Sequence, residues 1–157
     1  MSGREPVGVI GVGYVGLVTA ACLAELGHPV VCRDIVPERV EALRSGEVPI
    51  HEPGLPELLA RNAERLAFTL DMEDVFREAR IAIVCVDTPP TPSGDADLSR
   101  VEAVIDALPT TAEGAILVMK STVPVGTGRR IRAELDARGR DDVGYVSNPE
   151  FLREGSA

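Results

Sequence analysis

Several residue types are scarce in this sequence, and each scarcity excludes a class of protein. There are three Phe, two Tyr and no Trp among 157 residues, so the core must be aliphatic. No apolar run approaches the ~18 residues that a membrane-spanning helix needs. The segment 1–6 also lacks the apolar stretch of a secretion signal. We therefore expect neither a membrane partner nor export.

Lysine and cysteine are rare as well. Lys120 is the only lysine among 16 basic residues, and 25 acidic residues bring the net charge to −9. Nucleic acid is then an unfavourable partner, because affinity for phosphate backbones comes mainly from clustered Lys and Arg. Cys22, Cys32 and Cys85 lie in apolar runs, which is typical of reduced thiols in the core of a cytoplasmic protein. No cysteine or histidine pair has the spacing of a metal site.

Short Val- and Ile-rich runs alternate with segments rich in Ala, Leu, Arg and Glu, which is typical of buried parallel strands covered by helices. The predicted strands are 7–10, 30–33, 67–69, 81–86, 115–119 and 143–146. The predicted helices are 14–26, 37–44, 55–65, 71–79, 97 (or 98)–108 and 126 (or 127)–138. The length predicts one domain over 1–157. The expected fold is α/β, a doubly wound Rossmann-type parallel sheet of about six strands with helices on both faces.

A glycine-rich turn follows the first predicted strand. Gly11, Gly13 and Gly16 form the pattern G-x-G-x-x-G, with Tyr14 and Val15 before the last glycine. The first glycine of this pattern permits a tight turn, the second lets a pyrophosphate approach the backbone, and the third lets the helix pack closely on the strand. The pyrophosphate then lies at the positive end of the helix dipole. We predict a dinucleotide site here; the alternative is a glycine turn that holds no ligand.

Asp34 ends the second predicted strand, 18 residues after Gly16. This is close to the ~20 residues expected for the acid that binds a ribose 2′-hydroxyl. A carboxylate there would repel the 2′-phosphate of NADP, so the sequence favours NAD. Arg33 and Arg39 are close enough in sequence to supply a cation, although both can equally be solvated surface residues. If Arg33 is still in the strand, it should point to the opposite face from Asp34.

Ligands of an open α/β sheet bind beyond the carboxyl ends of its strands. Polar segments follow the fourth, fifth and sixth predicted strands. The first two bring the hydroxyl groups of Thr88, Ser121 and Thr122 near the expected cofactor edge. The third contains Glu150 and Glu154, which would share one face of a helix, where close carboxylates raise each other's pKa and one can act as general acid or base. The alternative is two ordinary solvated glutamates.

Together these motifs make the chain resemble the N-terminal NAD-binding domain of the UDP-glucose/GDP-mannose dehydrogenase family. The matching segments are Gly11–Leu17, Asp34, Val48–Leu55, Val86–Pro89, Ser121–Thr127 and Asn148–Gly155. They occur in the family's order and span essentially the whole chain. The resemblance implies a nucleotide-sugar 6-dehydrogenase of the UDP-glucose 6-dehydrogenase type, an oxidoreductase of nucleotide-sugar metabolism and polysaccharide biosynthesis. Such enzymes oxidise the sugar C6 alcohol to a carboxylate with two NAD in succession.

The resemblance also implies catalytic roles. In the family, the first oxidation gives an aldehyde, a cysteine captures it, the second gives a thioester, and water releases the acid. Glu150 matches a glutamate assigned to acid–base work in the hydrolysis of this thioester. Thr122 and Glu154 match residues that orient water and line the nicotinamide site.

Other matched positions imply binding roles. The substrate-binding positions for a UDP- or GDP-sugar are Glu150, Phe151, Leu152 and Arg153. The cofactor-binding positions, including those found from the glycine turn, are Gly11, Gly13, Tyr14, Val15, Gly16, Asp34, Arg39, Thr88, Pro89, Ser121, Thr122 and Glu154. NAD is the expected cofactor, and no metal is expected.

One element of the family pattern is missing. The family's nucleophilic cysteine lies in a glycine-rich segment of the C-terminal half, and this sequence contains no such segment. Without the C-terminal substrate domain, the chain is expected to bind NAD but not to turn over. The alternatives are a stand-alone, non-catalytic NAD-binding module and another Rossmann enzyme such as a hydroxy-acid dehydrogenase, against which residues 148–155 argue. Family members are typically homodimers through a central helix beyond this segment, so the chain is expected to be largely monomeric.

Overall fold

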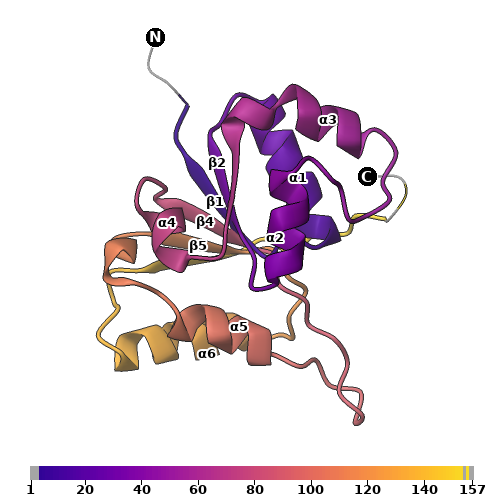
Figure 1. The fold of residues 1–157 in the computed structure, drawn as a ribbon. Coiled ribbons are helices and arrows are strands. Elements are labelled where there is room, and N and C mark those ends of the chain that lie inside the picture. The colour runs from indigo at the N-terminus through magenta and orange to yellow at the C-terminus, as the bar shows by residue number, and fades with distance from the viewer. Residues whose placement is uncertain (1–3, 154, 156–157) are drawn as a thin grey trace.

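A six-stranded parallel sheet forms the centre of the computed structural model, which describes residues 4–153 and 155 (Figure 1). The strands are β1 (Val7–Ile10), β2 (Val30–Arg33), β3 (Leu66–Thr69), β4 (Ile81–Val84), β5 (Ile116–Met119) and β6 (Gly144–Ser147). Their order in the sheet is β3-β2-β1-β4-β5-β6, and each neighbouring pair is parallel. The order reverses between β1 and β4, as in a doubly wound sheet. The predicted α/β fold class is confirmed.

Helices cover both faces of this sheet (Figure 1). They are α1 (Tyr14–Glu25), α2 (Pro37–Arg44), α3 (Leu55–Arg61), α4 (Met72–Phe76), α5 (Ser99–Asp106) and α6 (Thr127–Ala137), with 3-10 turns at Ala63–Arg65 and Thr110–Ala112. Pro37 begins α2, where a missing N–H costs nothing, and the Asp71 side chain caps α4 by accepting from the backbone N–H of Glu73. Among the described residues, no helix is long and apolar enough to cross a membrane.

Several predicted boundaries differ from the observed ones. The predicted helix 55–65 ends at Arg61 and continues only as a 3-10 turn, and the predicted helix 71–79 stops at Phe76. The predicted strand 81–86 ends at Val84. The regular hydrogen bonding between β4 and β5 ends at this residue, because the backbone N–H groups of Lys120 and Ser121 both donate to the Val84 carbonyl. Cys85 therefore lies just past β4 rather than within it.

The core has two halves, one on each face of the sheet, and both are largely aliphatic as predicted. Residues of α1, α2 and α3 pack on one face, and residues of α4, α5 and α6 pack on the other. Leu17 and Leu117 are fully buried in the respective halves. With both faces of the sheet covered, the strands contribute continuous apolar runs rather than alternating ones.

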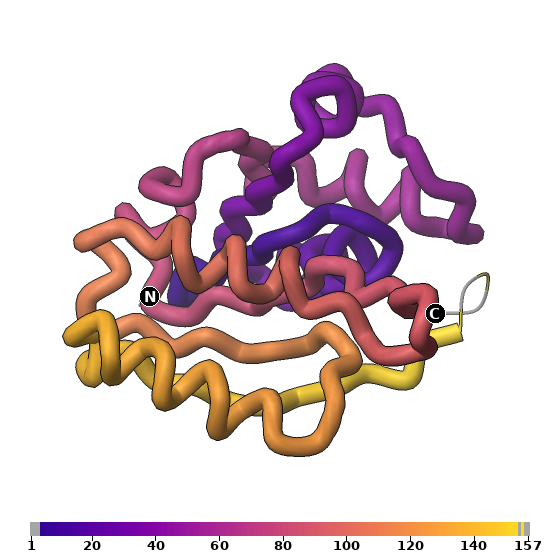
Figure 2. The backbone as a smooth tube through the Cα atoms, turned by 90° about the horizontal axis from the view of Figure 1, so that it is seen from below, coloured from indigo at the N-terminus to yellow at the C-terminus, as the bar shows by residue number. Residues whose placement is uncertain are grey.

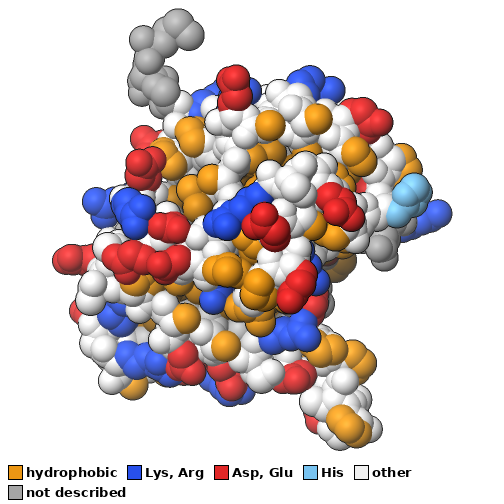
Figure 3. Space-filling view, viewed as in Figure 1, with side chains coloured by type: hydrophobic (Ala, Val, Ile, Leu, Met, Phe, Trp, Pro, Cys, Tyr) orange, Lys and Arg blue, Asp and Glu red, His pale blue; other side chains and the backbone are white. Residues whose placement is uncertain are grey.

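Helices α5 and α6 lie side by side on their face (Figure 2). Arg130 of α6 is ion-paired with Glu102 of α5, and Arg138 is ion-paired with Asp106. Acidic and basic side chains are interspersed on the face shown in Figure 3. The net charge of −9 is thus accompanied by many local ion pairs.

The cysteine prediction is correct for two residues and wrong for the third. Cys32 and Cys85 are buried, but Cys22 is exposed; all three are free thiols. Cys22 lies in α1 as predicted, and the helix turns its side chain outward, between Ala21 and Ala24, which are buried. An apolar run in a helix with a weak amphipathic pattern does not specify which of its residues face the core.

Candidate functional site

The glycine turn has the geometry that its sequence pattern predicts. Gly11 has φ +92°, and a Cβ added to it would lie 2.9 Å from the Cys85 carbonyl oxygen. A Cβ added to Gly16 would lie 1.8 Å from the carbonyl oxygen of Gly11. At Gly13 the added Cβ would meet only Asp87 Oδ1, at 3.8 Å. Two of the glycines therefore permit close packing, and the middle one leaves space above the backbone.

That space lies at the beginning of α1. Gly13 is the N-cap residue, no side chain caps the helix, and its first turn contains no acidic residue. Backbone N–H groups and the helix dipole make such a helix terminus favourable for an anion. The turn is therefore suited to hold a phosphate group against the backbone.

Asp34 lies directly after β2 with 4% of its surface exposed. Its Oδ2 accepts hydrogen bonds from the Val12 N–H (2.9 Å) and from Arg39 Nη1 (3.0 Å), and its Oδ1 accepts one from the Val36 N–H (3.0 Å). An ionised carboxylate has about four acceptor positions, so one position on Oδ1 is left for a further donor. The carboxylate is fixed in orientation and still able to bind a hydroxyl group.

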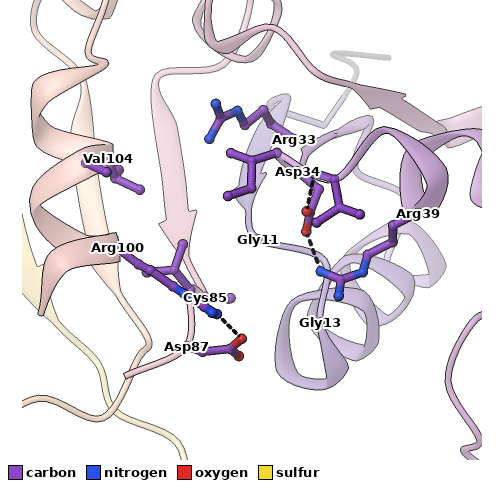
Figure 4. A pocket seen from close by; sticks show the side chains of 13 residues that line it. Gly11, Gly13, Arg33, Asp34, Arg39, Cys85, Asp87, Arg100 and Val104 are labelled. Carbon is purple, nitrogen blue, oxygen red and sulfur yellow. Dashed lines mark hydrogen bonds and ion pairs between the residues drawn. The ribbon is translucent and has the colours of Figure 1, made fainter. Parts of the chain in front are cut away.

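The two arginines near Asp34 have different partners. Arg33 and Arg39 line the same cavity as Asp34, and Figure 4 shows the Arg33 side chain extending away from the Asp34 carboxylate. β2 ends at Arg33, so the condition of that prediction, that both residues lie in the strand, is not met. Arg33 Nε donates to the Leu70 carbonyl at 3.3 Å, and burial lowers the pKa of this guanidinium.

Two neighbouring cavities lie at the carboxyl ends of the strands, and we refer to them together as the groove; Figure 4 shows the larger one. The larger has a volume of about 330 Å³ and extends from the glycine turn past Asp34 towards α5. The smaller, about 180 Å³, lies between the glycine turn and the segment after β5. They share four lining residues, Gly13, Cys85, Val86 and Asp87. The residues present fit a dinucleotide: a phosphate cradle lies in the middle and a buried carboxylate lies beside one end.

Most predicted cofactor residues line this groove. The larger cavity includes Gly11, Gly13, Asp34 and Arg39. The smaller includes Gly13, Tyr14, Val15, Thr88, Ser121 and Thr122, together with Glu150, which was predicted as a catalytic and substrate-binding residue. Gly16 packs behind the turn. Pro89 lines neither cavity, and its carbonyl accepts from the Asp97 N–H at 2.8 Å within the loop that follows β4.

Two of the predicted hydroxyl groups join neighbouring loops. Thr88 Oγ1 donates to the Thr122 carbonyl at 2.7 Å, and Ser121 Oγ donates to the Val86 carbonyl at 2.7 Å. These bonds connect the segment after β4 to the segment after β5. The two side chains thus shape the smaller cavity in addition to lining it.

The segment 148–153 follows β6 and contains no helix, so Glu150 does not lie on the predicted helix. Glu154 lies outside the described residues. The Glu150 carboxylate lines the smaller cavity and accepts a hydrogen bond from the Leu152 N–H. Phe151 is 91% exposed, and Leu152 and Arg153 are exposed as well.

Two long-range hydrogen bonds connect this C-terminal segment to the first half of the chain. The Tyr14 hydroxyl donates to the Arg153 carbonyl at 2.9 Å, and the Gly155 N–H donates to Glu52 Oε2 at 2.6 Å. Glu52 is buried. The first bond brings Arg153 beside the beginning of α1 and thus beside the groove, and the second connects Gly155 to the loop before α3.

The described cysteines next to the groove are poor nucleophiles. Burial raises the pKa of Cys85 to about 12, against a smaller opposing effect of Lys120. Burial also raises the pKa of Cys32 far above its usual range. Only the thiolate attacks a carbon centre, so neither thiol is activated at neutral pH. Among the described residues, no group of three or more His, Cys, Asp or Glu side chains is arranged to hold a metal ion.

Four charged residues that line the groove were not among the predicted site residues: Arg33, Asp87, Arg100 and Lys120. Asp87 and Arg100 form an ion pair there, and Arg100 comes from the first turn of α5. The position of Asp87 after a strand could have suggested a role. Nothing in the sequence indicates that a residue 13 positions later turns back towards it.

Fold and groove together define a dinucleotide-binding domain of the doubly wound class. Residues 5–157 match the family model "UDP-glucose/GDP-mannose dehydrogenase family, NAD binding domain". The chain therefore belongs to this family, which confirms the predicted family and NAD as its cofactor.

Curated relatives and a solved structure agree with this assignment. The chain is 48% identical over 157 residues to UDP-glucose 6-dehydrogenase of Pseudomonas aeruginosa, which covers 95% of the chain and 35% of that protein. It is 44% identical over 158 residues to UDP-glucose 6-dehydrogenase TuaD of Bacillus subtilis, with 98% and 34% covered. The structure of a UDP-glucose dehydrogenase from Pyrobaculum islandicum superimposes with a TM-score of 0.88 at 44% identity, covering 99% of this chain and 38% of that one. The chain thus spans about a third of the length of the curated relatives that it matches.

Proposed function

We propose that this chain binds NAD in the groove formed by the two joined cavities. The observation that carries the proposal is that the cavity beside the glycine turn and the buried Asp34 shares four lining residues with the smaller cavity. Asp34 Oδ1 has an acceptor position for a ribose hydroxyl, and the space above Gly13 suits a pyrophosphate. The adenosine half would occupy the larger cavity and the nicotinamide half the smaller one.

The remaining predicted cofactor residues have supporting roles in this proposal. Tyr14, Val15 and Thr122 would contact the nicotinamide half, because they line the smaller cavity. Thr88 and Ser121 hold its two loops together. Arg39 holds the Asp34 carboxylate in place, Gly16 permits the close approach of α1 to the turn, and Pro89 belongs to the loop after β4. Glu154 is the remaining residue of the predicted cofactor-binding set.

We further propose that the chain is the NAD-binding half of a nucleotide-sugar 6-dehydrogenase acting on a UDP- or GDP-sugar. Bound NAD supplies the hydride acceptor for oxidation of the sugar C6 alcohol. Glu150 and Thr122 both line the smaller cavity, where they can orient water and exchange protons near the reacting carbon, with Glu154 nearby in sequence. The exposed segment Phe151–Arg153, with Glu150, would contact the nucleotide sugar.

The chain by itself is expected to bind NAD without turning over substrate. Cys32 and Cys85 are held as thiols by burial, and Cys22 lies on the outer face of α1, so none of the three supplies an activated nucleophile in the groove. We propose a cytoplasmic, largely monomeric polypeptide that serves polysaccharide biosynthesis when joined to a substrate domain. A stand-alone module would instead be encoded by a reading frame that ends at this point.

Protein-detected NMR with NAD tests both the proposed NAD binding and the expected lack of turnover. Titration of the 157-residue chain is expected to shift the amide signals of Gly11–Gly16, Asp34 and Thr122. Addition of UDP-glucose or GDP-mannose to the NAD-saturated chain is expected to produce no NADH. Shifts confined to residues outside the groove would contradict the binding site, and NADH formation would contradict the expected inactivity.

A further inference from the structure

An ion pair lies at the border between the two cavities of the groove. Asp87 follows β4 and lines both cavities, and Arg100 lines the larger one. Arg100 Nη1 is paired with Asp87 Oδ2 across the groove (Figure 4). The two side chains are 51% and 69% exposed, respectively. Exposed ion pairs contribute little to folding stability, so the position of this pair calls for another explanation.

Asp87 faces the phosphate cradle. Its Oδ1 is the one atom within 4 Å of a Cβ added to Gly13, at 3.8 Å. Gly13 is the N-cap of α1, where the helix dipole favours an anion. A carboxylate thus lies beside the position proposed for a pyrophosphate, and it would repel that group unless a cation neutralised it.

Arg100 is the cation that is paired with Asp87, whereas Lys120 lines only the smaller cavity. The other cationic groups of the larger cavity are engaged on the side of Asp34: Arg39 with the Asp34 carboxylate and Arg33 with the Leu70 carbonyl. Arg100 approaches from α5 and pairs with Asp87 itself. Its guanidinium has five donors, more than one carboxylate oxygen requires.

We propose that the Asp87–Arg100 pair sets the affinity of the groove for a dinucleotide. Arg100 neutralises Asp87 in the free chain and shares its guanidinium between Asp87 and the pyrophosphate in the bound chain. Asp87 lowers the affinity, which limits retention of the dinucleotide after binding. This inference rests on the proposed NAD binding and assigns a role to two residues that lie outside the glycine motif.

Calorimetric titration with NADH and with ADP-ribose at low salt tests the proposal. Arg100→Gln is expected to weaken binding of both ligands by five- to twentyfold, because Asp87 is then unneutralised. Asp87→Asn is expected to tighten binding by two- to fivefold. The double variant should lie between the two single variants, and Arg100→Lys, which keeps the charge, should retain most of the affinity. All these differences should shrink at high salt, because they arise from exposed charges.

Matched controls come from another exposed ion pair, between Glu102 of α5 and Arg130 of α6. Arg130→Gln and Glu102→Gln make the same changes in net charge, and neither residue lines either cavity of the groove. They are expected to change NADH affinity less than twofold. If the wild-type chain binds NADH and Arg100→Gln shows no loss of affinity, or Asp87→Asn shows no gain, the inference is overturned and the proposed function stands. Failure of the wild-type chain to bind NADH would instead overturn the proposed function, and this inference with it.

Discussion

Gly13 and Gly16 are three residues apart in one turn, yet the space around them differs. An added Cβ at Gly16 would lie 1.8 Å from backbone, whereas one at Gly13 would have a single neighbour at 3.8 Å. The same motif thus contains one glycine required for packing and one required for the ligand. The sequence motif does not separate these two roles, whereas the atoms around each glycine do.

Alanine is therefore expected to lower the stability of the fold at Gly16 and the affinity for NADH at Gly13. Gly16→Ala should destabilise the fold by about 3 kcal/mol or more, because backbone must move to relieve the overlap. Gly13→Ala should leave the free energy of unfolding within about 1 kcal/mol of wild type, since its φ of −69° suits alanine, but should weaken NADH binding at least tenfold. Urea unfolding and fluorescence titration measure the two effects. A stable Gly16→Ala, or a Gly13→Ala that binds NADH normally, would contradict these assignments.

The three thiols are expected to differ in reactivity. Cys22 is exposed, whereas burial raises the pKa of Cys85 to about 12 and that of Cys32 further. At pH 8 the two buried groups are therefore unreactive thiols, whereas Cys22 is accessible to a reagent in solution. Iodoacetamide followed by mass spectrometry should modify one cysteine in the native chain and all three in denaturant. Rapid native modification of Cys85 would contradict the inert role assigned to it.

At the scale of elements, the carboxyl ends of the strands bring distant segments together. Helix α1, the loop after β4, the loop after β5 and the segment after β6 all supply residues to the smaller cavity. Residues 148–153 form no helix or strand, and hydrogen bonds from Tyr14 and to Glu52 connect the segment after β6 to the first half of the chain. These two residues are separated from their partners by 139 and 103 positions.

Loss of the Glu52 carboxylate should release this segment. Glu52→Ala removes the acceptor for the Gly155 N–H, and trypsin should then cut after Arg153 several times faster than in wild type. Glu57→Ala provides a matched control, because this glutamate is exposed in the first turn of α3. Mass spectrometry of timed digests measures the rate. Equal rates of cleavage in wild type and Glu52→Ala would show that the bond does not hold the segment.

Much of this architecture was predictable from local patterns. Strands β1 and β2 and helix α2 begin and end at the predicted residues, because apolar runs, Pro37 and the glycines mark them directly. The glycine turn and Asp34 were predictable because a strand, a turn and a helix at fixed spacing allow one geometry. The Asp87–Arg100 pair and the hydrogen bond between Glu52 and Gly155 were not, since they depend on how separate loops meet. The outward position of Cys22 was missed because α1 is apolar on most of its surface.

At the scale of the whole molecule, the sheet with its two covered faces supplies a rigid frame for the groove. Each face has its own buried cluster, and both clusters lie within the described residues. The groove is lined by six segments of this chain, and we therefore expect the domain to bind NAD by itself and to prefer it to NADP.

Isothermal titration of the 157-residue chain with NADH, and separately with NADPH, tests this claim most directly. The account predicts one NADH bound per chain and at least about tenfold weaker binding of NADPH, because the Asp34 carboxylate would repel the 2′-phosphate. No detectable heat at millimolar NADH, or equal affinity for NADPH, would contradict it.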